Sequence, residues 1–428
     1  MSRFLLTAMP FTGHVAPLTA VAAELVRRGH DVRVYTGTRF RDRVERAGAQ
    51  LVPWVRAPDF DENDLASAFP RLVGRKGFSQ LLANVVDCFV RTAPAQVADL
   101  SSEWEREPWD AIGADETSVG TALYSERRGT AWTTVGVLPL NLAGPEGPPS
   151  GMGIVPGTGP VGRARDAALR ALVPVLSRPI VKALAEAERA LALPVSGRSM
   201  DQVVFSPTAI AASGSPALDY GRTDRPGHLR FVGEIRTESS SPRAELPHWW
   251  CELDERVRGD RRIVLVTQGT QNIDPDDLVR PALQALAGRD VIVIATTGVP
   301  GRDSLPFPVP ENTRVMGFAP FAELLPLVDL AITNGGWGGT LAMLAHGIPL
   351  IVAGGDLDKP EVAARVAWSG AGIDLRTGTP RADAVSAAVD RALSDPVIVA
   401  AASRLGEQLR GLGGASAVAD VLEHTLTS

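Results

Sequence analysis

The first fifty residues alternate between short apolar runs and stretches with the spacing of a helix. Residues 4–9 form an apolar run typical of a buried strand, and residues 17–28 have a helical spacing that ends at Gly29. Residues 31–36 alternate between apolar and polar side chains as a strand does, and Gly48 ends a second helix-like stretch. Strands that alternate with helices in this way predict a parallel sheet with helices on both faces.

The same alternation begins again in the second half of the chain. Residues 262–267 and 290–295 have the pattern of strands, and residues 276–286 between them have the pattern of a helix. Residues 237–243 (TESSSPR), which separate the two halves, have the composition of a linker. We therefore expect an α/β protein of two Rossmann-like domains with ligands bound between them. The first half lacks the G-x-G-x-x-G fingerprint, which disfavours a nicotinamide enzyme.

Length and composition agree with this organisation. A chain of 428 residues exceeds one ordinary hydrophobic core. Its net charge of −6 argues against a nucleic-acid partner, and its two cysteines, Cys88 and Cys251, cannot form a disulfide framework. The N-terminal apolar run is too short for a signal sequence, and no run of 18 apolar residues exists. We therefore expect a cytoplasmic protein without a membrane span.

The glycine-rich residues 333–342 (TNGGWGGTLA) carry the strongest chemical signal. Four glycines in five positions lie between a strand-like run and a helix-like run. Glycines let backbone N–H groups approach a ligand closely, and the following helix directs its positive N-terminal end to the same place. A second polar loop, residues 354–361 (GGDLDKPE), adds carboxylates and a lysine suited to a ligand rich in hydroxyls. A phosphate site beside a polyol site predicts that the ligand is a nucleotide sugar.

These motifs resemble those of a known family. Residues 314–375 are similar to the donor-binding signature of the family 1 glycosyltransferases, and most similar to the bacterial branch that modifies natural products. Residues 11–18 (FTGHVAPL) resemble the first loop and the acceptor-side base of the same family. The resemblance implies the GT-B fold, in which the parallel sheets of two Rossmann-like domains face each other across a cleft. It also implies an inverting transfer of a sugar from a nucleoside diphosphate.

The expected domain boundaries follow from the linker composition and from the family pattern. Residues 1–236 would form the acceptor-binding domain, residues 237–247 the linker, and residues 248–395 the domain that binds the nucleotide sugar. In this family the last helix, roughly residues 396–425 within the terminal segment 396–428, would pack back on the first domain.

Transfer to a hydroxyl needs a base, and His14 follows the first strand, at the end of the sheet where ligands bind. An ordinary imidazole has a pKa near ~6.5, so its neutral form is available at cytoplasmic pH. A histidine after a glycine can also be structural, but the match to the family favours the base. A carboxylate would hold this base, and Asp115 matches the family position, with Glu116 and Asp110 as alternatives.

The resemblance also implies which residues bind the donor. Gly338, Gly339 and Thr340 would give backbone amides and a hydroxyl to the diphosphate, whereas Trp337 receives no chemical role. Thr270 could bind phosphate as well, with a turn or helix-capping role as the alternative. The complete set of expected nucleotide-sugar contacts is Gly13, Thr270, Phe318, Ala319, Asn334, Gly336, Gly338, Gly339, Thr340, Asp358 and Lys359.

Three positions depart from the family pattern. Asn334 stands where many members have a histidine that reaches a donor phosphate, and an amide cannot become cationic. Ala342 stands where plant-like members have a glutamate that holds the ribose hydroxyls. A donor without a 2′-hydroxyl, a thymidine diphosphate (dTDP) sugar, is therefore favoured over a uridine diphosphate (UDP) sugar, although backbone groups could hold a ribose as well. Lys359 replaces a glutamine beside Asp358 in the sugar-binding pair. Phe318 has the aromatic ring that stacks on the pyrimidine.

Two further segments need an interpretation. Residues 356–358 form a literal D-x-D, which binds a metal in another glycosyltransferase fold, but a helix-end phosphate site already supplies positive charge. We therefore expect no metal cofactor. Residues 144–162 hold seven glycines and five prolines and cannot form a core element. They are either a surface connection or a mobile lip over the acceptor pocket.

The sequence as a whole predicts an inverting glycosyltransferase that moves a sugar, possibly a deoxysugar, to a hydroxyl of a hydrophobic small molecule. The alternatives are nitrogen or carbon glycosylation on the same scaffold, a nucleotide-sugar epimerase, and a catalytically silent partner protein. The expected partners are the nucleotide sugar and the acceptor, and a homodimer is possible. The acceptor's identity is not encoded in any motif.

Overall fold

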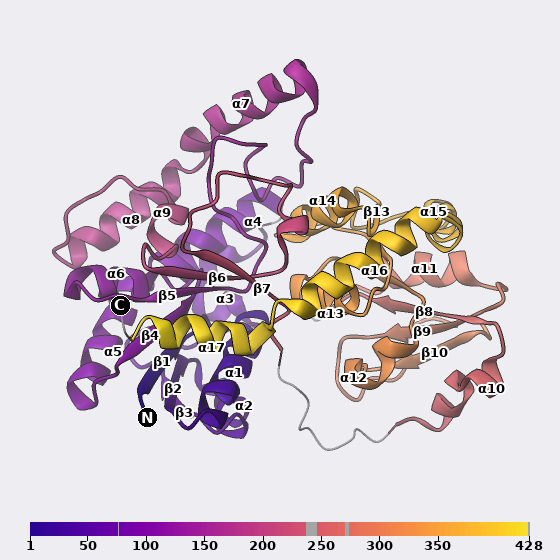
Figure 1. Cartoon of the computed structure of the whole chain (residues 1–428), viewed down its shortest axis with the longest axis horizontal. Helices are drawn as coiled ribbons and strands as arrows, with labels where there is room; N and C mark the ends of the chain where they lie inside the picture. Colours follow the sequence, from indigo (N-terminus) through magenta and orange to yellow (C-terminus); the bar gives the residue numbers. More distant parts are fainter. Residues whose placement is uncertain (76, 237–245, 270–273, 427–428) are drawn as a thin grey trace.

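The computed structural model describes residues 1–75, 77–236, 246–269 and 274–426, and it contains two parallel sheets (Figure 1). The strand order of the seven-stranded sheet is β3-β2-β1-β4-β5-β6-β7, and that of the six-stranded sheet is β10-β9-β8-β11-β12-β13. Neighbouring strands within each sheet are parallel. This arrangement confirms the predicted α/β architecture of two parallel sheets.

The strands of the first sheet are β1 (Arg3–Thr7), β2 (Asp31–Thr36), β3 (Gln50–Pro53), β4 (Ala111–Asp115), β5 (Thr133–Gly136), β6 (Ala209–Ser213) and β7 (Leu229–Gly233). Those of the second sheet are β8 (Arg262–Thr267), β9 (Val291–Thr296), β10 (Thr313–Met316), β11 (Leu330–Thr333), β12 (Leu350–Val352) and β13 (Gly372–Asp374).

The helices of the first half are α1 (Thr12–Arg27), α2 (Arg41–Arg46), α3 (Leu65–Ala68), α4 (Gly77–Ala83), α5 (Ala93–Arg106), α6 (Val119–Arg128), α7 (Gly159–Leu176), α8 (Arg178–Ala190) and α9 (Met200–Val204). Those of the second half are α10 (Glu255–Arg258), α11 (Val279–Leu286), α12 (Phe321–Leu324), α13 (Trp337–Ala345), α14 (Lys359–Ser369), α15 (Ala382–Ser394), α16 (Pro396–Gly411) and α17 (Gly414–His424). Short helical turns are η1 (Thr38–Phe40), η2 (Pro70–Leu72), η3 (Asn84–Val90), η4 (Pro216–Leu218), η5 (His248–Leu253) and η6 (Leu325–Leu327).

The strands are rich in apolar residues because both faces of each sheet are covered. In β1 the side chains of Phe4, Leu5 and Leu6 are fully buried. Successive side chains of a strand point to opposite faces, so Leu5 packs in one hydrophobic cluster while Phe4 and Leu6 pack in another. The second sheet is likewise covered by one cluster on each face. This burial explains why the strands were recognisable as continuous apolar runs.

Three predicted helices have different bounds in the structure. The helix predicted over residues 276–286 is α11, which begins at Val279. The first helix of the chain was predicted to begin at residue 17, but α1 begins at Thr12 and contains Pro17. Proline is common at the first position of a helix, but Pro17 lies further inside α1. It is tolerated there at the loss of one backbone hydrogen bond near the start of the helix. The terminal helix predicted as residues 396–425 is two helices, because Gly413 has a φ of +89° between α16 and α17. The earlier start of α1 matters because it includes His14.

The two C-terminal helices run from the second domain to the first (Figure 1). α16 packs against α13 and α15, whereas α17 packs against α1 and the strands β4 to β7. Leu422 of α17 is fully buried in the cluster that contains Leu6. Arg28 at the end of α1 binds Asp420 and Glu423 of α17, at 2.8 and 2.7 Å. The chain end therefore links the two domains. Most of the expected linker, residues 237–245, lies outside the described residues.

Candidate active site

His14 and Asp115 form a buried pair at the carboxyl end of the first sheet. α1 follows β1 directly, so His14 lies in its first turn, and Asp115 is the last residue of β4, which pairs with β1. The distance from His14 Nδ1 to Asp115 Oδ2 is 3.4 Å. The side chain of Asp115 is fully buried and that of His14 is 11% exposed. The structure thus brings together the two residues to which a base and its carboxylate were assigned.

Thr117 completes this pair and was not recognised from the sequence. Its hydroxyl donates a hydrogen bond to Asp115 Oδ1, at 2.5 Å, and lies 3.2 Å from His14 Nδ1. A threonine hydroxyl has one proton, and here that proton is used by the carboxylate. The proton between His14 Nδ1 and the oxygens of Thr117 and Asp115 is therefore carried by Nδ1 of the imidazole. The other ring nitrogen, Nε2, is left as the atom that can accept a proton.

The backbone around Asp115 keeps its carboxylate ionised. The N–H groups of Met9 and Thr117 donate to its two oxygens, at 2.7 and 2.6 Å. Burial raises the pKa of Asp115. The charge of His14 and the hydrogen bonds from His14, Thr117 and Met9 lower it by more, so the net shift of the pKa is downward. An ionised Asp115 can stabilise an imidazolium ion at His14.

The pKa of His14 shifts in the opposite direction. Burial of the ring lowers the pKa, but the charge of Asp115 and its hydrogen bond, together with the charges of Glu116 and Asp358, raise it above the ordinary value of 6.5. Asp358 belongs to the loop before α14 in the second domain, and its own pKa is raised chiefly by burial. Asp358 of the second domain is thus one of the charges that raise the pKa of His14.

The two alternative carboxylates have other partners. Glu116 accepts hydrogen bonds from the backbone N–H groups of Val137 and Leu138, at 2.8 and 2.6 Å. Burial, with a contribution from the charge of Asp115, raises the pKa of Glu116 to about 7. Asp110 forms a half-exposed ion pair with Arg3, at 2.8 Å. Both carboxylates therefore have structural roles that do not involve His14 directly.

The start of α13 has the features of an anion-binding helix end. The first N–H groups of a helix have no partner within it, and Gly336 is the N-cap of α13. A Cβ atom at Gly338 or Gly339 would meet no protein atom within 4 Å, and neither residue has a positive φ. Packing and backbone conformation therefore do not require glycine there, whereas close approach of a ligand would. The hydroxyl of Thr340 is buried and has no hydrogen-bond partner within the described part of the chain.

Asn334 and Lys359 have partners inside the protein. The side-chain amide of Asn334 donates to the backbone carbonyl of Gln268, and its oxygen accepts a hydrogen bond from Gly336 N, at 3.3 Å. Lys359 Nζ lies 2.8 Å from Asp356 Oδ1. Asn334 therefore connects the end of β8 to the glycine-rich segment, and the charge of Lys359 is balanced by one carboxylate of the D-x-D motif. The structure contains no cluster of three metal-ligating side chains among the residues it describes.

A cavity of about 1120 Å³ lies beside these residues. Asn334, Asp356 and Lys359 line it, and further parts of its wall come from the loop after β13, from α15 and from residues 153–155 of the first domain. The lining residues that sequence analysis did not single out include Gly153, Ile154, Val155, Arg165, Asp374, Arg376, Thr377, Thr379 and Arg391. These residues follow no recognisable motif, because they come from four separate segments.

Several expected donor contacts lie outside this cavity. Phe318 follows β10, and 62% of its surface is exposed, whereas the neighbouring Ala319 is buried. A Cβ at Gly13, in the first turn of α1, would meet no protein atom within 4 Å, as at Gly338. Thr270 lies outside the described residues. The expected contacts therefore extend from the surface after β10, past the start of α13, to the cavity beside α14.

Comparison with known proteins decides the family. A family model described as "Erythromycin biosynthesis protein CIII-like, C-terminal domain" matches residues 280–423. The chain is 36% identical over 426 residues to 4'-demethylrebeccamycin synthase of Lentzea aerocolonigenes, an alignment that covers 99% of each chain. The chain belongs to the family 1 glycosyltransferases. It is also 30% identical to UDP-glycosyltransferase 2 of Phaeomoniella chlamydospora, with 98% of this chain and 95% of that one covered.

Solved structures confirm the GT-B fold of this glycosyltransferase. The structure of the kitacinnamycin glycosyltransferase superposes with a TM-score of 0.74 and 21% identity, covering 99% of both chains. The Streptomyces sp. SF2575 glycosyltransferase SsfS6, solved with thymidine diphosphate, superposes with a TM-score of 0.65 and 18% identity, covering 99% of this chain and 100% of that one. The two parallel sheets are therefore the two domains of a GT-B enzyme.

Trp337 of the glycosyltransferase has a positional role that sequence analysis did not assign. Its indole N–H donates to Ser213 Oγ at the end of β6, at 2.8 Å. A Cβ at Gly214 would lie 2.8 Å from the indole ring, so the ring packs directly on the backbone of the first domain. The start of α13 is thereby fixed relative to the sheet that holds His14.

The geometry predicts a measurable pKa for His14. In ¹⁵N NMR titrations of the histidine side chains, with His14 assigned by comparison with the H14Q variant, His14 should titrate above ~6.5. In Asp115→Asn the imidazolium loses the charge that stabilises it, so the pKa of His14 should fall. A pKa that does not change in Asp115→Asn would contradict the assigned pairing.

Proposed function

We propose that this glycosyltransferase transfers a sugar, with inversion, from a nucleoside diphosphate donor to a hydroxyl of a hydrophobic small molecule. The observation that carries the proposal is the buried His14–Asp115 pair at the carboxyl end of the first sheet. Nε2 of His14 accepts the proton of the acceptor hydroxyl while the acceptor oxygen attacks the anomeric carbon from the face opposite the diphosphate. Asp115 stabilises the imidazolium that forms.

The bond between the anomeric carbon and the diphosphate oxygen breaks in the same step, and its electron pair leaves with the diphosphate. The backbone N–H groups at the start of α13 stabilise this charge, as does the positive end of the helix. The Thr340 hydroxyl, which lacks a partner among the described residues, is available to a phosphate oxygen. We propose that no metal ion is needed, because this helix end supplies the stabilisation.

Aromatic rings beside His14 support a hydrophobic acceptor. The ring of Phe11 lies 5.7 Å from the His14 ring, and that of Phe89 lies 6.4 Å from it, measured between centroids. Phe60 packs against Phe11 at 5.1 Å. An acceptor hydroxyl that reaches Nε2 of His14 would therefore belong to a molecule whose body contacts apolar side chains. Oxygen glycosylation is favoured over nitrogen or carbon glycosylation because a hydroxyl needs such a base.

Replacement of His14 tests its catalytic role. His14→Ala should lower turnover at least ~10²-fold, the usual scale of general-base catalysis, and leave the affinity for a nucleoside diphosphate nearly unchanged. Turnover is measured with a panel of aromatic polycyclic acceptors, and affinity by calorimetry. His248→Ala, a substitution at an exposed position in η5, is the matched control and should retain full activity. Full activity of His14→Ala would remove His14 from the mechanism.

The glycine positions of α13 allow a second test. Gly338→Ala places a methyl group where the protein has room, and alanine is a better helix former than glycine by roughly 0.5–1 kcal/mol. The variant should therefore unfold at the same temperature as the wild type or higher, while binding nucleoside diphosphate at least about tenfold more weakly through steric exclusion of the phosphate. Unchanged affinity would place the diphosphate elsewhere.

The nucleobase is tested by calorimetry of thymidine and uridine diphosphate, side by side, in the presence of a chelator. Ala342 and the thymidine diphosphate bound to SsfS6 support a dTDP donor, whereas the name UDP-glycosyltransferase 2 of a relative supports UDP. We expect binding without metal and a preference for thymidine diphosphate. A uridine preference would overturn the inference from Ala342, and binding that requires a divalent ion would overturn metal independence.

A further inference from the structure

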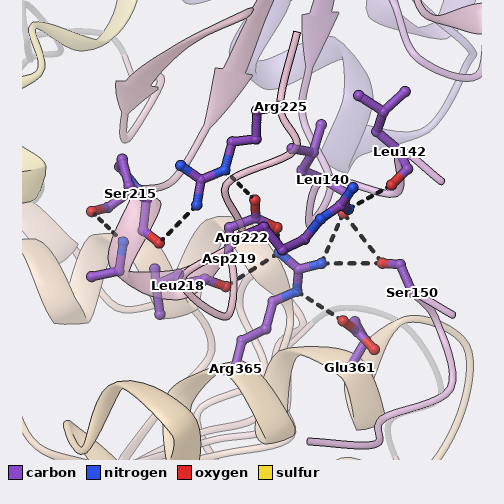
Figure 2. Close-up of polar contacts among 12 residues, drawn as sticks. Leu140, Leu142, Ser150, Ser215, Leu218, Asp219, Arg222, Arg225, Glu361 and Arg365 are labelled. Carbon is purple, nitrogen blue, oxygen red and sulfur yellow. Dashed lines mark hydrogen bonds and ion pairs between the residues drawn. The ribbon is translucent and has the colours of Figure 1, made fainter. Parts of the chain in front are cut away.

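Arg365 is a buried arginine of α14 that lies between the two domains. Its side chain is 2% exposed, and that of its partner Asp219, in the first domain, is 1% exposed. Its Nε donates to Glu361 at 2.9 Å, and its two terminal nitrogens donate to Asp219 Oδ1 and to the carbonyls of Leu218 and Leu140, at 3.2, 3.2 and 2.8 Å. Figure 2 shows these contacts converging on one guanidinium group.

A fifth hydrogen bond connects Arg365 to the glycine- and proline-rich segment. Its Nη2 donates to Ser150 Oγ at 3.1 Å, so that all five N–H groups of the guanidinium have an acceptor. Four of these acceptors belong to the first domain, whereas Glu361 lies one helical turn away on α14. A guanidinium fits this arrangement because its donors are planar and fixed, which an ammonium group could not reproduce.

Glu361 binds the same segment through its second oxygen. The backbone N–H groups of Gly151 and Gly153 both donate to Glu361 Oε2, at 3.0 and 3.1 Å. Gly153 has a φ of +64°, and a Cβ there would lie 2.7–2.8 Å from atoms of Pro360 in the first turn of α14. The segment therefore rests directly on the helix that begins after Asp358. It is a segment of the first domain that is docked on the second domain. Neither interpretation of the sequence, a surface connection or a mobile lip, included this docking.

Docking places this segment at the cavity beside α14. Gly153, Ile154 and Val155 line the cavity together with Lys359 and Asp356. Arg165 of α7 also lines the cavity and donates to the carbonyl of Val155, at 2.7 Å. Residues 153–155 and Arg165 therefore form the wall that the first domain contributes to this cavity.

We propose that Glu361 and Arg365 are positioning residues, which hold residues 150–155 of the first domain against α14 as a wall of the sugar-binding end of the donor site. Neither residue touches the reacting atoms. They act through the backbone of the segment and through the position of α14, whose first turn follows Asp358. The proposal rests on the proposed function, because it takes the sugar of the nucleotide sugar to lie beside Lys359 and Asp358.

The first test uses hydrogen exchange of the free protein, so that it needs no substrate. Glu361→Gln removes the charged acceptor of the two glycine amides, and their peptide should exchange at least about tenfold faster than in the wild type. Gly153→Ala should give the same result from the opposite side, through its clash with Pro360. Gly129→Ala is the matched control, because Gly129 at the end of α6 also has a positive φ, of +67°, but its Cβ would meet no atom within 4 Å and it lies outside the segment.

The second test separates positioning from stability. In Glu361→Gln, the KM for the nucleotide sugar should rise by about 5- to 150-fold, the usual range of coupling between linked sites, while the Kd for the bare nucleoside diphosphate stays unchanged. Glu103→Gln disturbs a buried ion pair with Arg33 inside the first domain and should alter the unfolding temperature only. Arg365→Lys should raise the KM for the nucleotide sugar as Glu361→Gln does. Lysine keeps the positive charge but lacks the planar set of five N–H donors of the guanidinium.

The outcomes distinguish the two proposals. Unchanged exchange of residues 150–155 in both Glu361→Gln and Gly153→Ala would overturn the positioning role, whatever the enzyme transfers. Faster exchange with an unchanged KM would overturn it as well, because the wall would not contact the sugar. Failure of the wild type to bind any nucleoside diphosphate would refute the proposed donor instead, and the exchange measurement would still decide whether the segment is held by α14.

Discussion

The guanidinium group of Arg365 is buried between the two domains, and its acceptors come from both of them. The position of one domain against the other depends on these contacts. Removing a charge from water is costly unless it is paired and its donors are satisfied. Arg365 meets this condition with Asp219 and two carbonyls of the first domain and with Glu361 of its own helix. Moving the domains apart would leave its charge with fewer acceptors. These contacts therefore favour the relative placement of the two domains seen in this structure.

The chemistry of the site is divided between the domains according to what each can supply. The first domain holds a titratable base in a buried pair, because strands β1 and β4 are neighbours and their carboxyl ends place His14 and Asp115 side by side. The second domain offers a helix end and small residues, which suit a diphosphate. Trp337 and Ser213 connect the two sets at 2.8 Å. In the proposed mechanism, the Trp337–Ser213 contact thus positions α13 relative to the sheet that holds His14 without taking part in the reaction.

Much of the fold and part of the site could be predicted from the sequence, because these features depend on local patterns. β2 and β8 have the predicted bounds, because β2 alternates between apolar and polar side chains and β8 is a nearly continuous apolar run. His14 could be located because it follows a strand and because the residues around it match the family. Thr117 could not, because its role depends on a turn that returns its hydroxyl to Asp115. Arg365 and Asp219 are 146 residues apart, and only the placement of the domains brings them together.

In the proposed mechanism, Asn334 and Lys359 leave the stabilisation of the leaving group mainly to the backbone. Asn334 uses its amide to bind the carbonyl of Gln268, and Lys359 is balanced by Asp356. Neither can supply a free positive charge to the diphosphate as a protonated histidine would. The α13 helix end provides its dipole and N–H groups without a change of protonation, so its contribution does not vary with pH. In the proposed mechanism, the pH dependence of turnover then reports His14 and the carboxylates whose charges raise its pKa, rather than the helix end.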